Sequence, residues 1–132
     1  MMEIRVAAGY RSIADVDAMI RMIGERVSGL APEAKYVIAA DWRNVTVMSP
    51  ETATRVRAML SKSNARAERS SILTLAVQST ANLQVQRLVR EAENDNRRHF
   101  VSARGQHDWL SQVLTAEESV RLSAFLGLTE GG

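Results

Sequence analysis

The architecture of the chain follows from one stretch, YVIAADWRNVTVMSPETATRVRAML, residues 36–60. Its first five residues, YVIAA, form an uninterrupted apolar run of the kind that parallel strands buried on both faces carry. The run ends at Asp41, a short turn follows, and Ser49 as N-cap with Pro50 at the first helical position starts an amphipathic helix. Open α/β sheets meet ligands and partners at the carboxyl ends of their strands, so we expect the functional surface at this junction.

Upstream, the sequence predicts one strand and one long helix. Residues 2–7 alternate weakly between apolar and charged side chains, as a half-buried strand does, and Gly9 ends the pattern. Ser12 and Asp15 form a predicted capping pair for the helix that follows, which Gly29 ends. Apolar residues recur along this helix at spacings of three and four: Ile13, Val16, Ile20, Ile23, Val27 and Leu30.

Downstream, the pattern continues to alternate between helix and strand. The polar residues 61–70 predict a loop, ILTLAV at residues 72–77 predicts a third strand, and residues 81–94 predict a helix that ends in an Asn-Asp-Asn turn. The predicted apolar stripe of that helix consists of Leu83, Leu88, Val89 and Ala92.

The C-terminal third predicts a short strand and two more helices. The strand covers residues 99–103, a brief helix surrounds Trp109, and Thr115 with Glu118 forms a capping box for a last helix that ends at Gly127. Together these elements predict an α/β fold with one domain over residues 1–132. We expect a parallel or mixed sheet of four strands or slightly more, with about five helices packed against it.

The composition is that of an ordinary globular protein. Hydrophobic residues make up 45% and charged residues 24% of the chain, and no apolar stretch approaches the roughly 20 residues that a membrane span requires. The net charge of +2 does not imply nucleic-acid binding. There is no Cys and no secretory signal pattern, so we expect a cytoplasmic protein that binds neither membrane nor nucleic acid.

The order of these elements resembles that of the STAS domain, named for sulphate transporters and anti-sigma-factor antagonists. Residues 4–9 are similar to that family's strand and glycine before its first helix, and residues 37–48 to its central strand and following loop. Asp41-Trp42-Arg43 and Trp109-Leu110 resemble motifs of small bacterial STAS-like proteins. The resemblance covers nearly the whole chain and implies a STAS-like fold with a non-enzymatic regulatory role.

The resemblance also implies a docking surface, with one departure. Anti-sigma-factor antagonists carry Asp-Ser-Ser-Gly where this chain has Ser49-Pro50-Glu51-Thr52, so the phosphoacceptor position falls on Glu51 and the phosphoswitch is not expected. Glu51 could act as a fixed negative charge, or simply as an acidic residue that interacts well with the helix dipole. The predicted partner-binding residues lie between positions 41 and 55: Asp41, Arg43, Ser49, Glu51, Thr52 and Arg55.

Two kinds of binding role stay open. The first is docking of another protein through the loop and helix start at residues 41–55, with a homodimer as a further possibility because the first helix has coiled-coil-like spacing. The second is binding of a small apolar or anionic ligand, such as a lipid, between the sheet and its helices.

No constellation of residues predicts an enzyme, a metal site or a cofactor. His99 and His107 are the only histidines and have no thiol or acidic cluster beside them, so a zinc site is not expected. We expect His99 to be a solvated edge residue and His107 to interact with Asp108. No glycine-rich phosphate loop is present.

Overall fold

The computed structural model describes residues 1–6, 10, 12–31, 34–61 and 67–128. Strands and helices alternate along them, as the sequence predicts, whereas the predicted break at Gly9 lies outside the described residues. The elements in chain order are β1 (Met2–Arg5), α1 (Ile13–Ser28), β2 (Tyr36–Asp41), α2 (Pro50–Ser61), β3 (Ala67–Leu73), α3 (Ser79–Ala92), β4 (Arg97–Phe100), α4 (Ala103–Ser111) and α5 (Ala116–Leu126).

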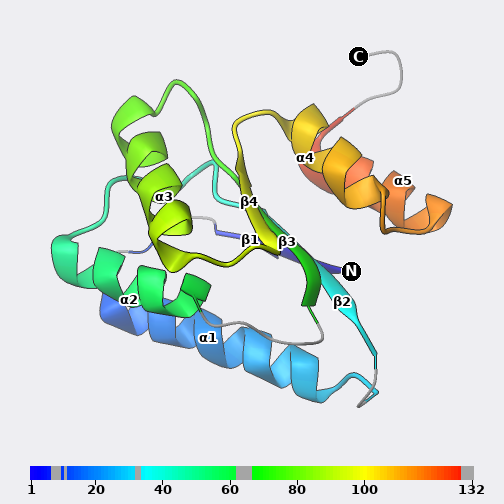
Figure 1. Cartoon of the computed structure of the whole chain (residues 1–132), viewed down its shortest axis with the longest axis horizontal. Helices are drawn as coiled ribbons and strands as arrows, with labels where there is room; N and C mark the ends of the chain where they lie inside the picture. Colours follow the sequence, from blue (N-terminus) through cyan, green and yellow to red (C-terminus); the bar gives the residue numbers. More distant parts are fainter. Residues whose placement is uncertain (7–9, 11, 32–33, 62–66, 129–132) are drawn as a thin grey trace.

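The four strands form one parallel sheet in the order β1-β2-β3-β4 (Figure 1). One row across the sheet contains Ile4, Ala40, Ile72 and His99. Consecutive strands are neighbours, and right-handed crossovers between such strands place their helices on one face of the sheet. The predicted α/β class with a four-stranded sheet and five helices is therefore confirmed.

The sheet has a hydrophobic core on each face. Helices α1, α2 and α3 pack over Ile38 and Ala40, whereas α4 and α5 pack over Val37 and Ala39 (Figure 1). Successive residues of a strand point to opposite faces, so β2 must be apolar at every position to serve both cores. This is the physical reason for the uninterrupted apolar run in β2.

The third strand is not where the sequence predicts it. It covers Ala67–Leu73, so part of the predicted loop at residues 61–70 is strand, and residues 74–77 lie beyond its end. The buried Ser71 explains the error, because hydrogen bonds allow this polar residue to lie inside the sheet. Its hydroxyl donates to the Ile38 carbonyl at 3.2 Å and accepts from Gln106 Nε2 at 2.8 Å. Leu75 and Val77, which are apolar enough to suggest a strand, are exposed.

Of the predictions about helix caps, strand ends and burial, some are confirmed and others are wrong. The capping box of Thr115 and Glu118 and the left-handed Gly127 are confirmed. Strand β4 begins two residues earlier than predicted and ends before Val101, which is exposed. Leu83 was predicted in the apolar stripe of α3 but is 63% exposed, and Ser12 occupies the N-cap of α1 without a side-chain capping bond.

Candidate functional site

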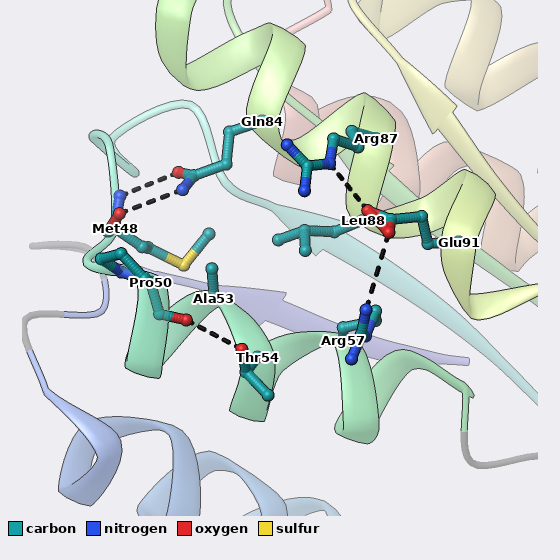
Figure 2. Close-up of a pocket in the computed structure, with 9 residues that line it drawn as sticks. All are labelled: Met48, Pro50, Ala53, Thr54, Arg57, Gln84, Arg87, Leu88 and Glu91. Atoms are coloured by element: carbon teal, nitrogen blue, oxygen red, sulfur yellow. Dashed lines mark hydrogen bonds and ion pairs between the residues drawn. The ribbon is translucent and has the colours of Figure 1, made fainter.

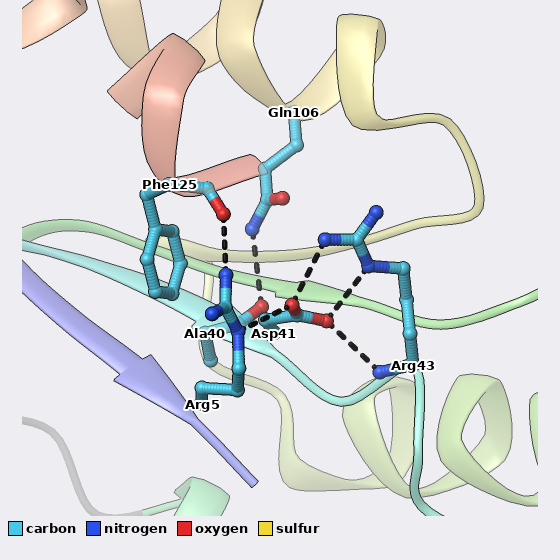
Figure 3. Close-up of polar contacts among 6 residues, drawn as sticks. All are labelled: Arg5, Ala40, Asp41, Arg43, Gln106 and Phe125. Carbon is cyan, nitrogen blue, oxygen red and sulfur yellow. Dashed lines mark hydrogen bonds and ion pairs between the residues drawn. The ribbon is translucent and has the colours of Figure 1, made fainter. Parts of the chain in front are cut away.

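The carboxyl end of β2 carries a buried carboxylate held by two arginines (Figure 3). Asp41 accepts from Arg43 Nε and Nη2, both at 2.9 Å, and from Arg5 Nε at 3.1 Å. Burial alone would raise the pKa of Asp41, but the hydrogen bonds and charge of Arg43, with help from Arg5, outweigh burial and hold that pKa below its ordinary value. Asp41 and Arg43 therefore lie together, as the sequence predicts.

This cluster faces α4 and α5 and attaches them to the sheet (Figure 3). Arg5 donates to the Phe125 carbonyl near the end of α5, and its guanidinium lies 4.6 Å from the centre of the Phe125 ring. The buried Gln106 of α4 donates from Nε2 to the Ala40 carbonyl at 3.2 Å. The Asp41 cluster is thus a structural anchor of one face.

The other predicted site residues belong to α2, on the opposite face of the sheet. Ser49 caps the helix, since its Oγ accepts from the Thr52 backbone N–H at 3.3 Å and donates to Thr52 Oγ1 at 2.9 Å. Thr52 is buried, whereas Glu51 is exposed in the first turn. Arg55 Nε lies 2.8 Å from Asp17 Oδ1 and so links α2 to α1. The structure does not bring the six predicted residues together on one surface.

A groove of about 300 Å³ lies between α2 and α3 (Figure 2). The Gln84 amide exchanges two hydrogen bonds with the Met48 backbone, at 2.8 and 3.0 Å, and thereby holds the loop before α2 against α3. Glu91 at the other end lies 2.8 Å from Arg87 and 3.6 Å from Arg57. The charge of Glu91 is thus matched by arginines of the protein itself, and the contacts in the groove join α2 to α3. We therefore attribute a structural role to the groove.

A larger cavity of about 610 Å³ lies between α1, α2 and the sheet. Its lining is mainly apolar, and the side chains that α1 contributes are only partly buried. Sequence patterns did not reveal it, because the size of such a space depends on how far α1 lies from the sheet. The main apolar lining residues are Ile38, Ala40 and Ile72 from the sheet, Ile20, Ile23 and Val27 from α1, and Met59 from α2.

Two polar side chains that sequence reasoning missed also line this cavity. Tyr10 is 6% exposed and packs edge-on against the buried Trp42, with ring centres 5.1 Å apart. The Tyr10 hydroxyl is buried and has no hydrogen-bond partner among the residues described, and burial raises the pKa of Tyr10. Arg97 is the second polar residue of the lining. In the sequence it directly follows the Asn-Asp-Asn turn, a position that does not by itself indicate a cavity.

Neither histidine is a free surface residue. His99 Nε2 lies 2.7 Å from Thr74 Oγ1, and burial lowers the pKa of His99, so its prediction as a solvated edge residue is wrong. The strand that carries it is too close to α3 for the ring to be fully solvated, since Thr74 also donates to Asn82 of α3. His107 lies 3.6 Å from Asp108, as predicted, but also hydrogen-bonds Ser123 of α5.

Across the part of the chain that the structure describes, no group of three or more His, Cys, Asp or Glu side chains is placed to hold a metal ion. None of the described helices combines the length and the apolar character needed to cross a bilayer. No family model, curated protein or solved structure matches this chain.

Proposed function

We propose that this protein binds a small, mainly apolar molecule in the cavity between α1, α2 and the sheet. The observation that carries the proposal is the cavity volume of about 610 Å³, which falls within the range of roughly 300–1,000 Å³ typical of ligand pockets. Protein interiors are normally packed as densely as organic crystals, with few voids larger than a water molecule. An apolar space of this size is therefore well suited to an apolar guest.

The partial burial of the lining side chains supports the same proposal. Ile20, Ile23 and Val27 form the inward stripe of α1, yet none of them is fully buried. A bound apolar molecule would remove more of their surface from water, at about 25 cal/mol for each Å². The stripe thus offers binding free energy that folding alone has not used.

The proposal is tested by titrating the protein with Nile red, a neutral dye that fluoresces in apolar surroundings. We expect saturable binding, and we expect Ile23→Trp to weaken it at least about tenfold, because the larger ring occupies the cavity that Ile23 lines. The matched control is Val120→Trp on α5, which is 71% exposed and on the other face. Absence of saturable binding, or equal binding by wild type and Ile23→Trp, would contradict the proposal.

A second candidate function is docking of another protein, the role that the STAS resemblance implies. It is favoured by exposed apolar side chains near the carboxyl ends of the strands, among them Val47, Val77 and Leu83. The hydrogen bonds between Met48 and Gln84 bring the loop of Val47 onto the helix of Leu83. Exposed apolar patches of this kind are common at protein interfaces.

For this second function we expect a cytoplasmic partner, or a second copy of the chain, to contact these side chains together with residues 41–55. A partner captured by wild type and lost by Leu83→Ser, then rebound as a purified protein, would support docking. Sedimentation of the purified chain tests the homodimer. Glu51→Gln distinguishes a fixed-charge role from a helix-dipole role, because only the former predicts a loss of partner binding without a loss of stability.

A further inference from the structure

We propose that the ligand of this cavity is an amphiphile whose anionic head group, a carboxylate or a phosphate, pairs with Arg97. This inference rests on the proposed small-molecule function and adds the chemical class of the ligand. It is carried by the position of Arg97 and by the kind of partners that Arg97 has.

Arg97 lies at the start of β4, where polar side chains collect at one end of the cavity. Its neighbour in the sheet register is Ser70, and both line the cavity together with Ser61, Asn94 and Asn96. The apolar side chains of α1 and of the middle of the sheet line the remainder. The cavity is therefore amphiphilic, with one polar end that contains a positive charge.

The side chain of Arg97 is partly buried, and its described partners are neutral. Its Nε donates to Ser70 Oγ at 3.2 Å, and a second N–H donates to the Leu60 carbonyl. No carboxylate pairs with it among the residues that the structure describes, and burial lowers its pKa. A partly buried cation without an anion is costly, and a guanidinium matches a carboxylate or phosphate through parallel hydrogen bonds.

Other arginines of the chain show what Arg97 lacks. Six of them lie within ion-pair distance of a carboxylate of the protein, although several are more exposed than Arg97 and need the pairing less. These six are Arg5, Arg43, Arg55, Arg57, Arg87 and Arg121. Of the two arginines that line the cavity, Arg55 is thus paired with Asp17, whereas Arg97 has no carboxylate among the described residues and is left to an anion from outside.

Tyr10 marks the end of the cavity opposite Arg97. Tyr10 contacts Trp42, which directly follows β2 and is four residues beyond Ile38. Ile38 pairs with Ser70, the sheet neighbour of Arg97, and so marks the level of Arg97 along the strand. Four residues of a strand span roughly 13 Å. The ring of Tyr10 lines the cavity together with Trp42, whereas the Tyr10 hydroxyl is buried away from it. The cavity therefore has a cation at one end and uncharged aromatic side chains toward the other.

The experiment compares three probes with the same apolar chain by isothermal titration: dodecanoate, dodecyl phosphate and dodecanol. It is done at pH 8, below the critical micelle concentrations of the anionic probes. We expect at least one anion to bind about tenfold more tightly than dodecanol, and the better of the two identifies the head group. Arg97→Gln should abolish that preference and leave the affinity for dodecanol unchanged.

Arg98→Gln is the matched control, because Arg98 is the next residue of β4 but lies against Trp109 on the other face. It should keep the preference for the anion. Arg97→Lys keeps the charge and should keep a weaker preference, so the inference can still be tested if Arg97→Gln does not fold. Equal binding of anion and alcohol by wild type would overturn the inference but not the proposed function, whereas binding of none of the three probes would overturn both.

Discussion

The sheet is filled with side chains on the face that α4 and α5 cover, but encloses a cavity on the face that α1, α2 and α3 cover. On the filled face, Leu110 and Leu122 have no exposed surface at all. On the hollow face, Ile20 and Ile23 are only partly buried. The same central strand contributes to both, so the difference lies in how each layer of helices is attached.

Polar contacts explain that difference in attachment. Gln106 hydrogen-bonds both β2 and β3 from α4, and Arg5 reaches from β1 to the end of α5. The cavity side instead contains Arg97, whose described partners are a hydroxyl and a carbonyl rather than a carboxylate. Under the proposed function, the filled face holds the fold together and the hollow face binds the ligand.

The largest expected effect comes from truncating one side chain on each face. Leu110→Ala should lower the free energy of unfolding by about 2–5 kcal/mol, because it opens a void in a filled core. Ile23→Ala should cost only about 1 kcal/mol, because part of that side chain already borders open space. Urea unfolding of both variants provides the measurement, and equal costs would contradict the distinction between the faces.

The next effect concerns the anchor of the filled face. Asp41→Asn should cost about 1–3 kcal/mol, because it removes the charge that two arginines share. The folded-state pKa of Asp41 is below its ordinary value, so its stabilisation is present above about pH 4 and is lost as the pH falls through the folded pKa. The difference between wild type and variant should thus shrink in acid, and a difference that stays constant as the pH falls would contradict the prediction.

A smaller effect of opposite sign is expected on the hollow face. Gly24 lies inside α1, and a methyl group added there would meet nothing within 4 Å. Gly24→Ala should therefore raise the free energy of unfolding by about 0.5–1 kcal/mol, the usual difference between these residues in a helix. Gly127→Ala is the control, since its φ of 75° should make the same change destabilising. A destabilised Gly24→Ala would mean that α1 packs more tightly than described.

The smallest effect is a pH dependence at the edge of the hollow face. Burial lowers the pKa of His99, so the folded state favours the neutral ring. Its contribution to stability is full above the unfolded pKa of about 6.5 and declines as the pH falls toward the folded pKa. In thermal unfolding, the melting temperature of wild type should fall between pH 8 and pH 5, and that of His99→Gln should fall less. Identical slopes of melting temperature against pH would contradict this prediction.

The sequence predicted those features that depend on short-range patterns. The run in β2 and the capping box at Thr115 are both visible within a few residues. Strand β3 was misplaced because Ser71 is stabilised by Gln106, 35 residues away. The burial of Thr52 and the polar partners of Arg97 likewise depend on how the helices pack. A local sequence pattern carries no information about that packing.

The contacts of Arg5 with Phe125 and of Glu3 with Arg121 join positions 120 and 118 residues apart. During synthesis on the ribosome, the chain emerges from its N-terminus, and the first strands and their helices can assemble while the rest is still being made. The apolar face formed by Val37, Ala39 and Leu73 then stays uncovered until α5 leaves the exit tunnel. The filled face is therefore the last part of the fold to close in a nascent chain.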